Sequence, residues 1–413
     1  MRNDHFYDYK FVKDYLCSCK AIRYNHVMDF YCYAVTAPGL RDLAARELEK
    51  LGILPPGQDS VSTSPDHGGV EFRADLSTLY RANLHLRTAS RVLVRLGNFF
   101  YARTFTELRT AASRLAWERF LSPGQPIEIR VTCHKSKLYH SDAVAERIGI
   151  AIAERLGQAS PIQKFQGEEE QNPPQLILAR LVNDRMTISI DSSGALLHRR
   201  GYRLATGKAP LRETLAAAML MACNWDRVSP LIDPFCGSGT IPIEAALMAL
   251  EIPPGINRRF AFMGWTGFDE ATWQAVYTEA TKTKKTKPPV ILASDRDAGA
   301  IRIAQENAAR AGVAEYIEFT NQAVSAIQPP QQPGWIITNP PYGERVSANK
   351  DLRNLYAQFG NVLHALCPGW QVGILCSDPI LLGQTRLALD TATRMINGGL
   401  SVSLAQGKVT KKE

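Results

Sequence analysis

The spacing of hydrophobic residues follows one style up to about residue 195 and another from about Leu211. In the first stretch, runs that alternate apolar and polar residues stand between segments in which apolar residues recur every three or four positions. Alternation predicts half-buried strands, and the longer period predicts amphipathic helices. We therefore expect the first half of the chain to form α+β structure.

Two α+β units are expected in this half, at 30–98 and 99–195. The first has predicted helices at 40–51 and 76–90 and predicted strands in GGVEFRA and RVLVRLG. The second has predicted helices at 107–120 and 141–156 and predicted strands in PIEIRVTC, LILARLVND and RMTISID. The polar segment GEEEQNPPQ is typical of an exposed loop within the second unit.

Strand and helix segments alternate from about Leu211, after a linker at 196–210. This order predicts parallel βαβ units with helices on both faces of one sheet. The expected strands lie in PLIDPF, VILASD, YIEFT, WIITN and QVGILCS. The last two β-rich runs meet at Asn397-Gly398-Gly399, which is a hairpin signal. We expect a Rossmann-like domain over 211–413 whose mostly parallel sheet ends in an antiparallel hairpin.

Length and composition indicate an ordinary multidomain globular protein of the cytoplasm. A chain of 413 residues exceeds the usual size of one hydrophobic core. No run of about 18 apolar residues is present, and the N-terminus lacks the apolar core of a signal peptide. Residues 1–29 show no periodicity, and a second methionine, Met28, precedes the first apolar run. We expect 1–29 to be a disordered or non-native extension.

The charge balance indicates a polyanionic partner. The formal net charge is +8, which makes nucleic acid the natural candidate. Eight arginines but only two acids lie between Leu79 and Arg119, and arginine both clamps phosphates and stacks on bases. We expect an RNA-holding surface that also includes Lys135, Lys137, Arg199, Arg200 and Arg203. The alternative for each of these residues is a solvated basic face without a partner.

The segment LIDPFCGSGTIPIEAA, at 231–246, is the strongest candidate for a cofactor site. A buried strand ends at Asp233, a turn follows, and a helix begins near Thr240. Gly237 and Gly239 have no Cβ, so the backbone can turn tightly and approach a ligand closely. The segment lacks the Lys-Ser/Thr pair of a P-loop and the full GxGxxG of dinucleotide folds. A strand-to-helix turn without a ligand is the alternative.

A second acid follows the next predicted strand. VILASD ends at Asp295, where a carboxylate can accept hydrogen bonds from ribose hydroxyls. Asp297 is expected to be the N-cap of the following helix. The distance from Asp233 to Asp295 is long for a simple βαβ unit, so we expect an insertion at 253–289. The eight cysteines lack the usual zinc or redox spacings, and we expect no metal site.

The motif Asn339-Pro340-Pro341-Tyr342 follows the apolar run WIIT. An exocyclic amine on a base is a poor nucleophile because its lone pair is delocalised into the ring. The Asn339 side-chain oxygen and the Pro340 carbonyl are placed to accept both amino hydrogens and so localise that lone pair, while the prolines fix the backbone. Tyr342 is expected to stack on the target base after the base leaves its own stack.

Taken in order, these motifs resemble the THUMP-containing, S-adenosylmethionine-dependent RNA methyltransferases, and are similar to the bacterial large-subunit ribosomal RNA guanine-N2 methyltransferases. The resemblance covers about 30–408 and also includes KSKLYHS, LLHRRGYR, APLRETLAAA and IPPGINRRFAFMGW. It implies a ferredoxin-like domain at 30–98 and a THUMP domain at 99–195, which together bind structured RNA. The class I methyltransferase domain follows at 211–413.

The resemblance also implies which residues meet S-adenosylmethionine and the target amine. The target amine lies at Asn339, Pro340 and Tyr342. The cofactor site is formed by Asp233, Phe235, Gly237, Gly239, Thr240, Asp295 and Gln322. Gln322 is a departure, since similar enzymes often carry an acid there to hold the adenine amino group; a glutamine carbonyl can accept the same hydrogen bond.

The motifs leave other functions open. Transfer-RNA guanine-N2 methylation fits them as well as ribosomal RNA methylation does, because THUMP domains serve both RNA classes. A DNA amino-methyltransferase also carries NPPY, but the THUMP-like half argues against it. A non-catalytic RNA-binding assembly factor is a further alternative, from which decay of the NPPY loop or the glycine turn would be expected.

Overall fold

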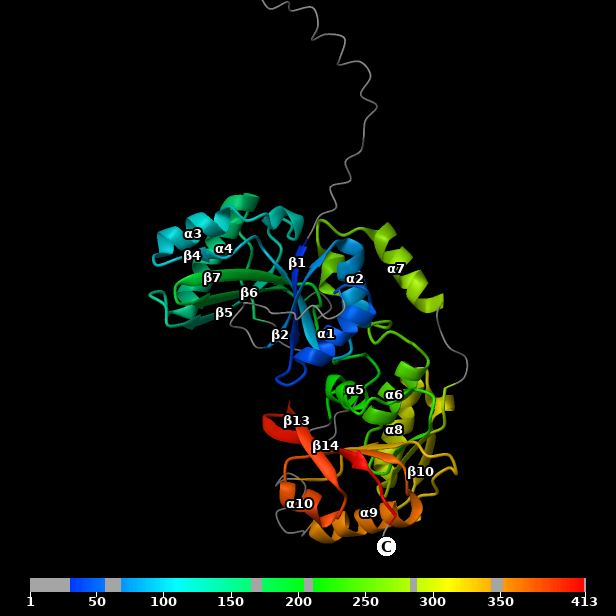
Figure 1. The fold of residues 1–413 in the computed structure, drawn as a ribbon. Helices are drawn as coiled ribbons and strands as arrows, with labels where there is room; N and C mark the ends of the chain where they lie inside the picture. Colours follow the sequence, from blue (N-terminus) through cyan, green and yellow to red (C-terminus); the bar gives the residue numbers. More distant parts are fainter. Residues whose placement is uncertain are drawn as a thin grey trace, which may run out of the picture.

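A computed structural model describes residues 30–55, 68–164, 173–203, 211–282, 288–342 and 352–411. These ranges leave out the expected extension at 1–29 and residues 204–210 of the linker. They also leave out residues 283–287 of the lysine-rich segment KTKKTK, which begins at Lys282. The described chain forms two halves, each built on its own sheet, stacked one above the other (Figure 1). Within the described ranges, no helix is long and apolar enough to cross a membrane.

The first half is built on one continuous seven-stranded sheet in the order β2-β1-β3-β7-β6-β5, with β4 paired to β7. The two expected α+β units share this sheet, because Leu93 in β3 pairs with Asp191 in β7. Among the described strands of this sheet, β5 and β6 are the one parallel pair. The strands are β1 (Phe30–Thr36), β2 (Gly69–Ala74), β3 (Ala89–Arg95), β4 (Phe100–Tyr101), β5 (Ile127–His134), β6 (Gln175–Val182) and β7 (Arg185–Asp191).

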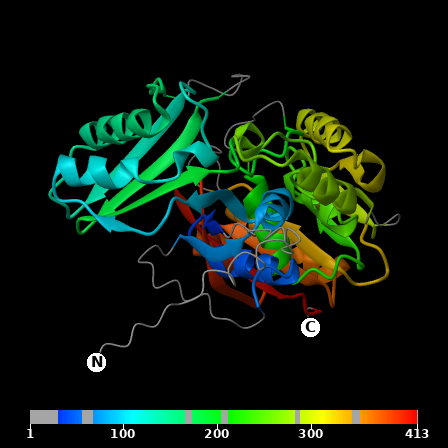
Figure 2. The same cartoon turned by 90° about the horizontal axis from the view of Figure 1, so that it is seen from above.

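Four helices pack against this sheet and share one hydrophobic core with it. They are α1 (Arg41–Lys50), α2 (Leu76–His85), α3 (Phe105–Ser113) and α4 (Ser141–Leu156), with a 3-10 turn η1 (Trp117–Arg119). Helices α3 and α4 lie side by side over the sheet (Figures 1 and 2). The bounds predicted for α4 are confirmed, and its end at Gly157, with φ +77°, is the left-handed cap that glycine favours.

Two predicted helices end earlier than the sequence pattern indicated. Helix α2 stops at His85 because the next residues turn to meet α1: the Glu47 carboxylate accepts from the backbone amides of Arg87 and Thr88 at 2.8 and 2.9 Å. Helix α3 begins at a Thr104 capping box and ends at Ser113. The buried Trp117 then folds back and donates its indole N–H to the Ala112 carbonyl at 2.8 Å.

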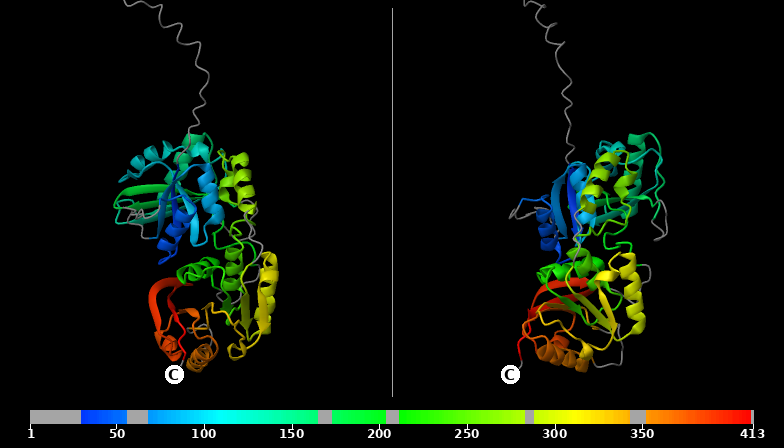
Figure 3. Two further views of the ribbon diagram at one scale, coloured as in Figure 1. Left: turned by 45° about the vertical axis from the view of Figure 1, so that its right-hand side comes forward. Right: turned by 90° about the vertical axis from the view of Figure 1, so that its right-hand side faces the viewer.

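The second half contains the predicted doubly wound sheet, in the order β10-β9-β8-β11-β12-β14-β13. The first five strands of this order run parallel, β14 runs antiparallel to β12, and β13 runs antiparallel to β14. The predicted hairpin is confirmed, with both Gly398 and Gly399 at positive φ, and it forms one edge of the sheet (Figure 3). The strands are β8 (Leu231–Asp233), β9 (Ile291–Asp295), β10 (Glu318–Asn321), β11 (Trp335–Thr338), β12 (Gln371–Cys376), β13 (Leu389–Asn397) and β14 (Leu400–Lys408).

Helices cover both faces of this second sheet, as expected for βαβ units. One face packs against α5 (Glu213–Ala222), α6 (Thr240–Ala249) and α8 (Ala298–Arg310). The other packs against α9 (Arg353–Leu366) and α10 (Pro379–Gln384). Short 3-10 turns η3 (Ala314–Tyr316) and η4 (Val324–Ala326) flank β10.

The insertion expected at 253–289 packs on the first half of the molecule. It contains the 3-10 turn η2 (Ala261–Gly264) and α7 (Glu270–Lys282), which lies beside α2 (Figures 1 and 3). Phe262 stacks on Tyr80 of α2 with ring centroids 4.4 Å apart, and Trp273 meets the same tyrosine edge-on. These contacts extend the core of the first half and attach the two halves to each other.

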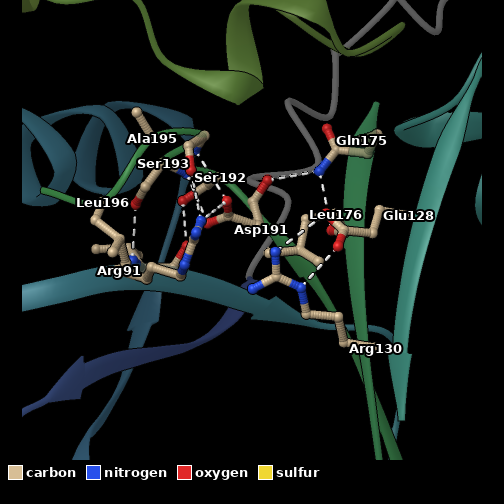
Figure 4. A network of polar contacts seen from close by, with 12 residues as sticks. Arg91, Glu128, Arg130, Gln175, Leu176, Asp191, Ser192, Ser193, Ala195 and Leu196 are labelled. Carbon is tan, nitrogen blue, oxygen red and sulfur yellow. Dashed lines mark hydrogen bonds and ion pairs between the residues drawn. The ribbon is translucent and has the colours of Figure 1, made fainter. Parts of the chain in front are cut away.

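A buried polar junction lies where the chain leaves the first sheet. The Asp191 carboxylate at the end of β7 pairs with Arg91 of β3 and accepts from the backbone amides of Ser193 and Gly194 (Figure 4). Arg258 of the insertion donates to the carbonyls of Ser193 and Ala195. Because these groups are partnered, the segment leading to the second half is held against the first sheet.

Candidate active site

Three predicted site segments meet at one edge of the second sheet. Asp233 ends β8, Asp295 ends β9, and Asn339 follows β11. The strand order places β8 between β9 and β11, and all three run parallel. Their carboxyl ends therefore meet where the strand order reverses, the position at which open α/β sheets bind ligands.

The two glycines of the turn after β8 have different structural roles. Both have positive φ, +51° at Gly237 and +83° at Gly239. A Cβ on Gly239 would lie 2.9 Å from the Cβ of Ala304, so this glycine permits close packing of α8. A Cβ on Gly237 would meet no described atom within 4 Å, so the backbone there faces open space. A ligand can approach the chain at Gly237.

Asp295 is bonded to this turn. One carboxylate oxygen accepts from the amide of Gly237 at 3.0 Å, and the other accepts from the amide of Asp297 at 3.0 Å. A carboxylate has about four lone-pair sites, so these two bonds leave acceptors for a ligand. Asp297 caps α8 by accepting from Gly299 and Ala300, which confirms the predicted N-cap.

Asp233 lies beneath the turn. It is 1% exposed, and one carboxylate oxygen accepts from the Thr338 hydroxyl at 2.6 Å and from the Phe235 amide at 3.2 Å. Burial raises the pKa of Asp233 to about 7, against the lowering effect of those two hydrogen bonds. Asp233 therefore joins β8, β11 and the turn and offers almost no surface to a ligand, and its contact with the cofactor stays a prediction.

Thr240 is also directed into the protein. It is 4% exposed, and its hydroxyl accepts from the guanidinium of Arg203. Its hydroxyl attaches Arg203 to the start of α6, and the contact of Thr240 with the cofactor stays a prediction.

Asn339 presents an acceptor that lacks a partner. Its side-chain oxygen is buried, and within the described part of the chain it has no hydrogen-bond partner. Pro340 is buried beside it. An unpaired buried oxygen is destabilising by about 1–3 kcal/mol, so few are retained without a function. This oxygen is suited to receive a donor from a ligand.

Two residues that the sequence analysis missed hold the loop that contains this asparagine. The Tyr342 hydroxyl accepts from the Asn397 amide at 3.0 Å, and Asn397 belongs to the terminal hairpin. The buried Tyr356 of α9 donates to the Pro341 carbonyl at 3.3 Å. Both contacts join residues far apart in sequence, and no local motif marks them.

The remaining predicted cofactor residues lie at the same edge. Phe235 is half-buried and meets Phe359 of α9 edge-on, with ring centroids 5.3 Å apart. Gln322 directly follows β10, and its backbone amide donates to the Asp295 carbonyl at 3.1 Å. Its side chain therefore starts from the strand next to Asp295, and its contact with adenine stays a prediction.

Three family profiles match consecutive parts of the chain. Residues 31–93 match the RlmL ferredoxin-like domain, 102–191 match the THUMP domain, and 200–405 match the RMKL-like methyltransferase domain. The Synechocystis protein slr0064, which carries a provisional RNA methyltransferase name, is 34% identical over 376 residues, or 90% of this chain and 95% of the relative. The chain belongs to the RlmL-like family of THUMP-containing methyltransferases.

Other members of this RlmL-like family support the same assignment. The ribosomal RNA large subunit methyltransferase K/L of Photobacterium profundum is 34% identical over 392 residues. That match covers 92% of this chain but 54% of the relative, so the chain spans about half the length of the K/L proteins. The solved structure of SMU.472, provisionally described as a methyltransferase and complexed with SAH, is 30% identical with a TM-score of 0.80, and covers 93% of this chain and 99% of that one.

The RlmL-like family uses S-adenosylmethionine, and the site described above fits that cofactor. The open backbone at Gly237 allows close approach, and Asp295 retains acceptor capacity for ribose hydroxyls. The unpaired Asn339 oxygen follows β11, the strand beside β8, where a substrate group would meet the methyl donor. The prediction of the cofactor is therefore consistent with the residues that would hold it.

The basic residues predicted to hold RNA separate into two groups in this RlmL-like chain. Lys135 and Lys137 are exposed on the loop after β5, and Arg199 is half-buried. Arg200 is 4% exposed; it pairs with the buried Glu244 of α6 at 3.4 Å and donates to the Arg87 carbonyl. Arg203 pairs with Glu213 at 3.5 Å. The Arg200 guanidinium connects the two halves, and the Arg203 guanidinium contacts Glu213 and Thr240 of the second half. The RNA contacts predicted for these two arginines stay predictions.

Proposed function

We propose that this chain transfers a methyl group from S-adenosylmethionine to the exocyclic N2 of a guanine in RNA, with 23S ribosomal RNA as the substrate. The observation that carries the proposal is the buried, unpaired side-chain oxygen of Asn339 at the carboxyl end of β11. An acceptor in that state is matched to an N–H donor brought by the substrate.

The chemistry requires the amine nitrogen to regain its lone pair. Asn339 Oδ1 and the Pro340 carbonyl accept one amino hydrogen each, which draws the nitrogen toward tetrahedral geometry. S-adenosylmethionine supplies an electrophilic methyl group. The nitrogen lone pair forms the new C–N bond as the C–S bond breaks with its electron pair moving to sulfur, and the methylated nitrogen then releases one proton to solvent.

Preorganisation of the acceptors comes from the surrounding chain. Two prolines restrict the backbone, and Tyr356 donates to the Pro341 carbonyl from below. Tyr342 is half-buried with its hydroxyl held by Asn397, so its ring has little freedom to turn away from a flipped base. Stacking on such a ring contributes about 1–3 kcal/mol per base and offsets part of the cost of flipping.

The choice of ribosomal RNA rests on the relatives. The K/L proteins are named as ribosomal RNA large subunit methyltransferases, and their matched portion includes all three domains of this chain. Transfer RNA is the second candidate, because the acceptor pair at Asn339 and Pro340 recognises an amine and does not distinguish the RNA that contains it.

A direct test uses the full chain with methyl-tritiated S-adenosylmethionine and, separately, ribosomal RNA, transfer RNA and DNA. We expect label in ribosomal RNA with the wild-type protein, loss of label with Asn339→Ala, and normal label with Asn257→Ala, a matched change at an exposed asparagine outside the loop. Label in DNA alone, or equal label with Asn339→Ala, would contradict the proposal.

A further inference from the structure

The two faces of the first sheet have different chemistry. Residues Val92, Val94, Ile188 and Ile190 lie on the face that joins the helices in the hydrophobic core. The alternate positions, on the other face, include Arg95 opposite Ser189 and Arg180 opposite Thr187. The arginines and hydroxyls of this second face lie outside the hydrophobic core, so this face is a candidate for ligand binding.

A pocket of about 390 Å³ lies on this second face, across β1, β3, β6 and β7. That volume is within the range of small-ligand sites, roughly 300–1,000 Å³. Its chemistry-bearing lining residues are Tyr31, Arg95, Phe99, Tyr101, Arg180 and Arg185. One carboxylate, Glu71, also lines it and lies 3.6 Å from Arg95. Three guanidinium groups against one carboxylate favour an anionic ligand.

The aromatic rings of the pocket are presented to solvent. Phe99 is 47% exposed and Tyr101 is 62% exposed, and their rings meet edge-on with centroids 6.0 Å apart. The guanidinium of Arg185 lies over the Phe99 ring, 3.8 Å from its centroid. Tyr31, on the opposite side of the pocket, is 49% exposed. Exposed aromatic rings beside arginines are the combination on which unpaired bases stack while phosphates are neutralised.

The pocket continues into the basic loop after β5. The backbone amide of Lys137 donates to the Asp184 carboxylate at 2.7 Å, and Asp184 directly precedes Arg185. Ala102, next to Tyr101, donates its amide to the Asp184 carbonyl at 2.9 Å. The exposed Lys135 and Lys137 therefore lie at the same end of the sheet as Tyr101 and Arg185 and extend the positive surface beyond the pocket.

We propose that this face binds an unpaired segment of the substrate RNA, with bases stacked on Phe99 and Tyr101 and phosphates bound by Arg95, Arg180 and Arg185. The proposal rests on the proposed function for the choice of RNA as ligand. It adds the strand state of the bound segment, because a stacked base must be free of its pairing partner. Duplex RNA offers phosphates but no open base faces.

The test measures binding without methylation, so the result does not depend on catalysis. The probes are a fluorescein-labelled RNA hairpin with a ten-nucleotide single-stranded 3′ tail and the same hairpin without the tail, each titrated with the full chain at fixed salt and followed by anisotropy. We expect the tailed hairpin to bind at least about tenfold more tightly, since each stacked base contributes about 1–3 kcal/mol. No S-adenosylmethionine is added, which separates binding from the proposed catalysis, and Asn257→Ala, at an exposed position outside the pocket, should bind both probes like the wild type.

Variants assign the effect to the pocket. Tyr101→Ala and Arg185→Ala should each weaken binding of the tailed hairpin about tenfold. Tyr101→Trp should bind the tailed hairpin like the wild type, because the larger ring still stacks. Arg302→Ala, which removes an exposed arginine on α8, is the matched control and should have no effect. Equal affinity for the tailed and blunt hairpins would overturn the proposal. It would also be overturned if Tyr101→Ala weakened binding of the blunt hairpin and left binding of the tailed hairpin unchanged. Displacement of the tailed hairpin by uridine monophosphate at equal nucleotide concentration would also overturn it.

Discussion

The side-chain amide of Asn397 donates a 3.0 Å hydrogen bond to the Tyr342 hydroxyl. The first residue belongs to the terminal hairpin and the second ends the Asn-Pro-Pro-Tyr motif, so the edge of the sheet controls the position of the aromatic ring. Burial raises the pKa of Tyr342, and this hydrogen bond opposes the rise. The hydroxyl is therefore neutral at physiological pH and retains its hydrogen bond.

Asn397→Ala should lower methyl transfer through Tyr342. Loss of one neutral hydrogen bond is worth about 0.5–1.5 kcal/mol, so we expect a roughly 2- to 12-fold decrease in kcat/KM. Tyr342→Phe removes the same bond and should decrease kcat/KM similarly, and the double variant should be no worse than either single variant. Ser401→Ala, at an exposed position of the same hairpin, is the control. Additive losses in the double variant would show that the two residues act independently.

Asn339→Ala should separate activity from stability. We expect kcat to fall about 10²- to 10³-fold, the usual effect of removing one transition-state hydrogen bond. The free energy of unfolding should not decrease, because the substitution removes a buried oxygen that has no partner in the described chain. Chemical denaturation of both proteins measures this. Marked destabilisation would mean that the oxygen has a structural partner in the folded protein.

Asp295→Ala should weaken S-adenosylmethionine binding at least about tenfold, as measured by titration calorimetry. The carboxylate both anchors the Gly237 amide and offers acceptors to the ribose, and hydrogen bonds to charged groups contribute about 1.5–3 kcal/mol. Asp297→Ala is the matched control: it removes the N-cap of α8, lowers stability by about 1 kcal/mol and leaves the affinity unchanged. Equal affinities for wild type and Asp295→Ala would remove Asp295 from the cofactor site.

Asp233 should make the protein less stable as the pH rises. Its folded pKa is about 7, above the ordinary value near 4, so the folded state binds the proton more tightly. The stabilisation is complete below about pH 4 and is lost as the pH rises through about 7. Melting temperatures at pH 5 and pH 8 should therefore differ less in Asp233→Asn than in the wild type. Asp142→Asn, at an exposed position of α4, should retain the wild-type difference.

Arg200 and Lys137 should give opposite results in two assays. Arg200→Ala removes the nearer guanidinium from the buried Glu244, which keeps Arg87 at 3.9 Å and the Tyr202 hydroxyl at 3.3 Å. Breaking a buried ion pair costs up to about 3–5 kcal/mol, so we expect a marked loss of stability and little change in the RNA affinity of the folded fraction. Lys137→Ala should change stability by less than about 0.5 kcal/mol and reduce the salt dependence of RNA binding. A stable Arg200→Ala protein with weak RNA binding would restore Arg200 to the RNA surface.

The features that sequence predicted well are those coded within short segments. The glycine turn, the Asp297 cap, the hairpin at Gly398-Gly399 and helix α4 each depend on neighbouring residues. The unexpected features depend on contacts between distant residues. Pairing of Leu93 with Asp191 merges two predicted units into one sheet, and stacking of Phe262 on Tyr80 moves the insertion onto the other half.

The candidate site shows the same limit. Local pattern was enough to place Asn339, Asp295 and the two glycines after neighbouring parallel strands, at one edge of the second sheet. It could not show that Asp233 and Thr240 are turned inward, because their partners Thr338 and Arg203 lie far away in sequence. Composition counted Arg200 among the surface charges, since nothing in its neighbourhood reveals the buried Glu244 with which it pairs.

The most direct measurement is nucleoside mass spectrometry of ribosomal RNA and transfer RNA after incubation with the full chain and isotopically labelled S-adenosylmethionine, with Asn339→Ala in parallel. We expect labelled N2-methylguanosine from ribosomal RNA with the wild-type protein and none with the variant. Label confined to another nucleoside, or N2-methylguanosine formed equally by Asn339→Ala, would contradict the assignment of a guanine amine to the Asn339 site.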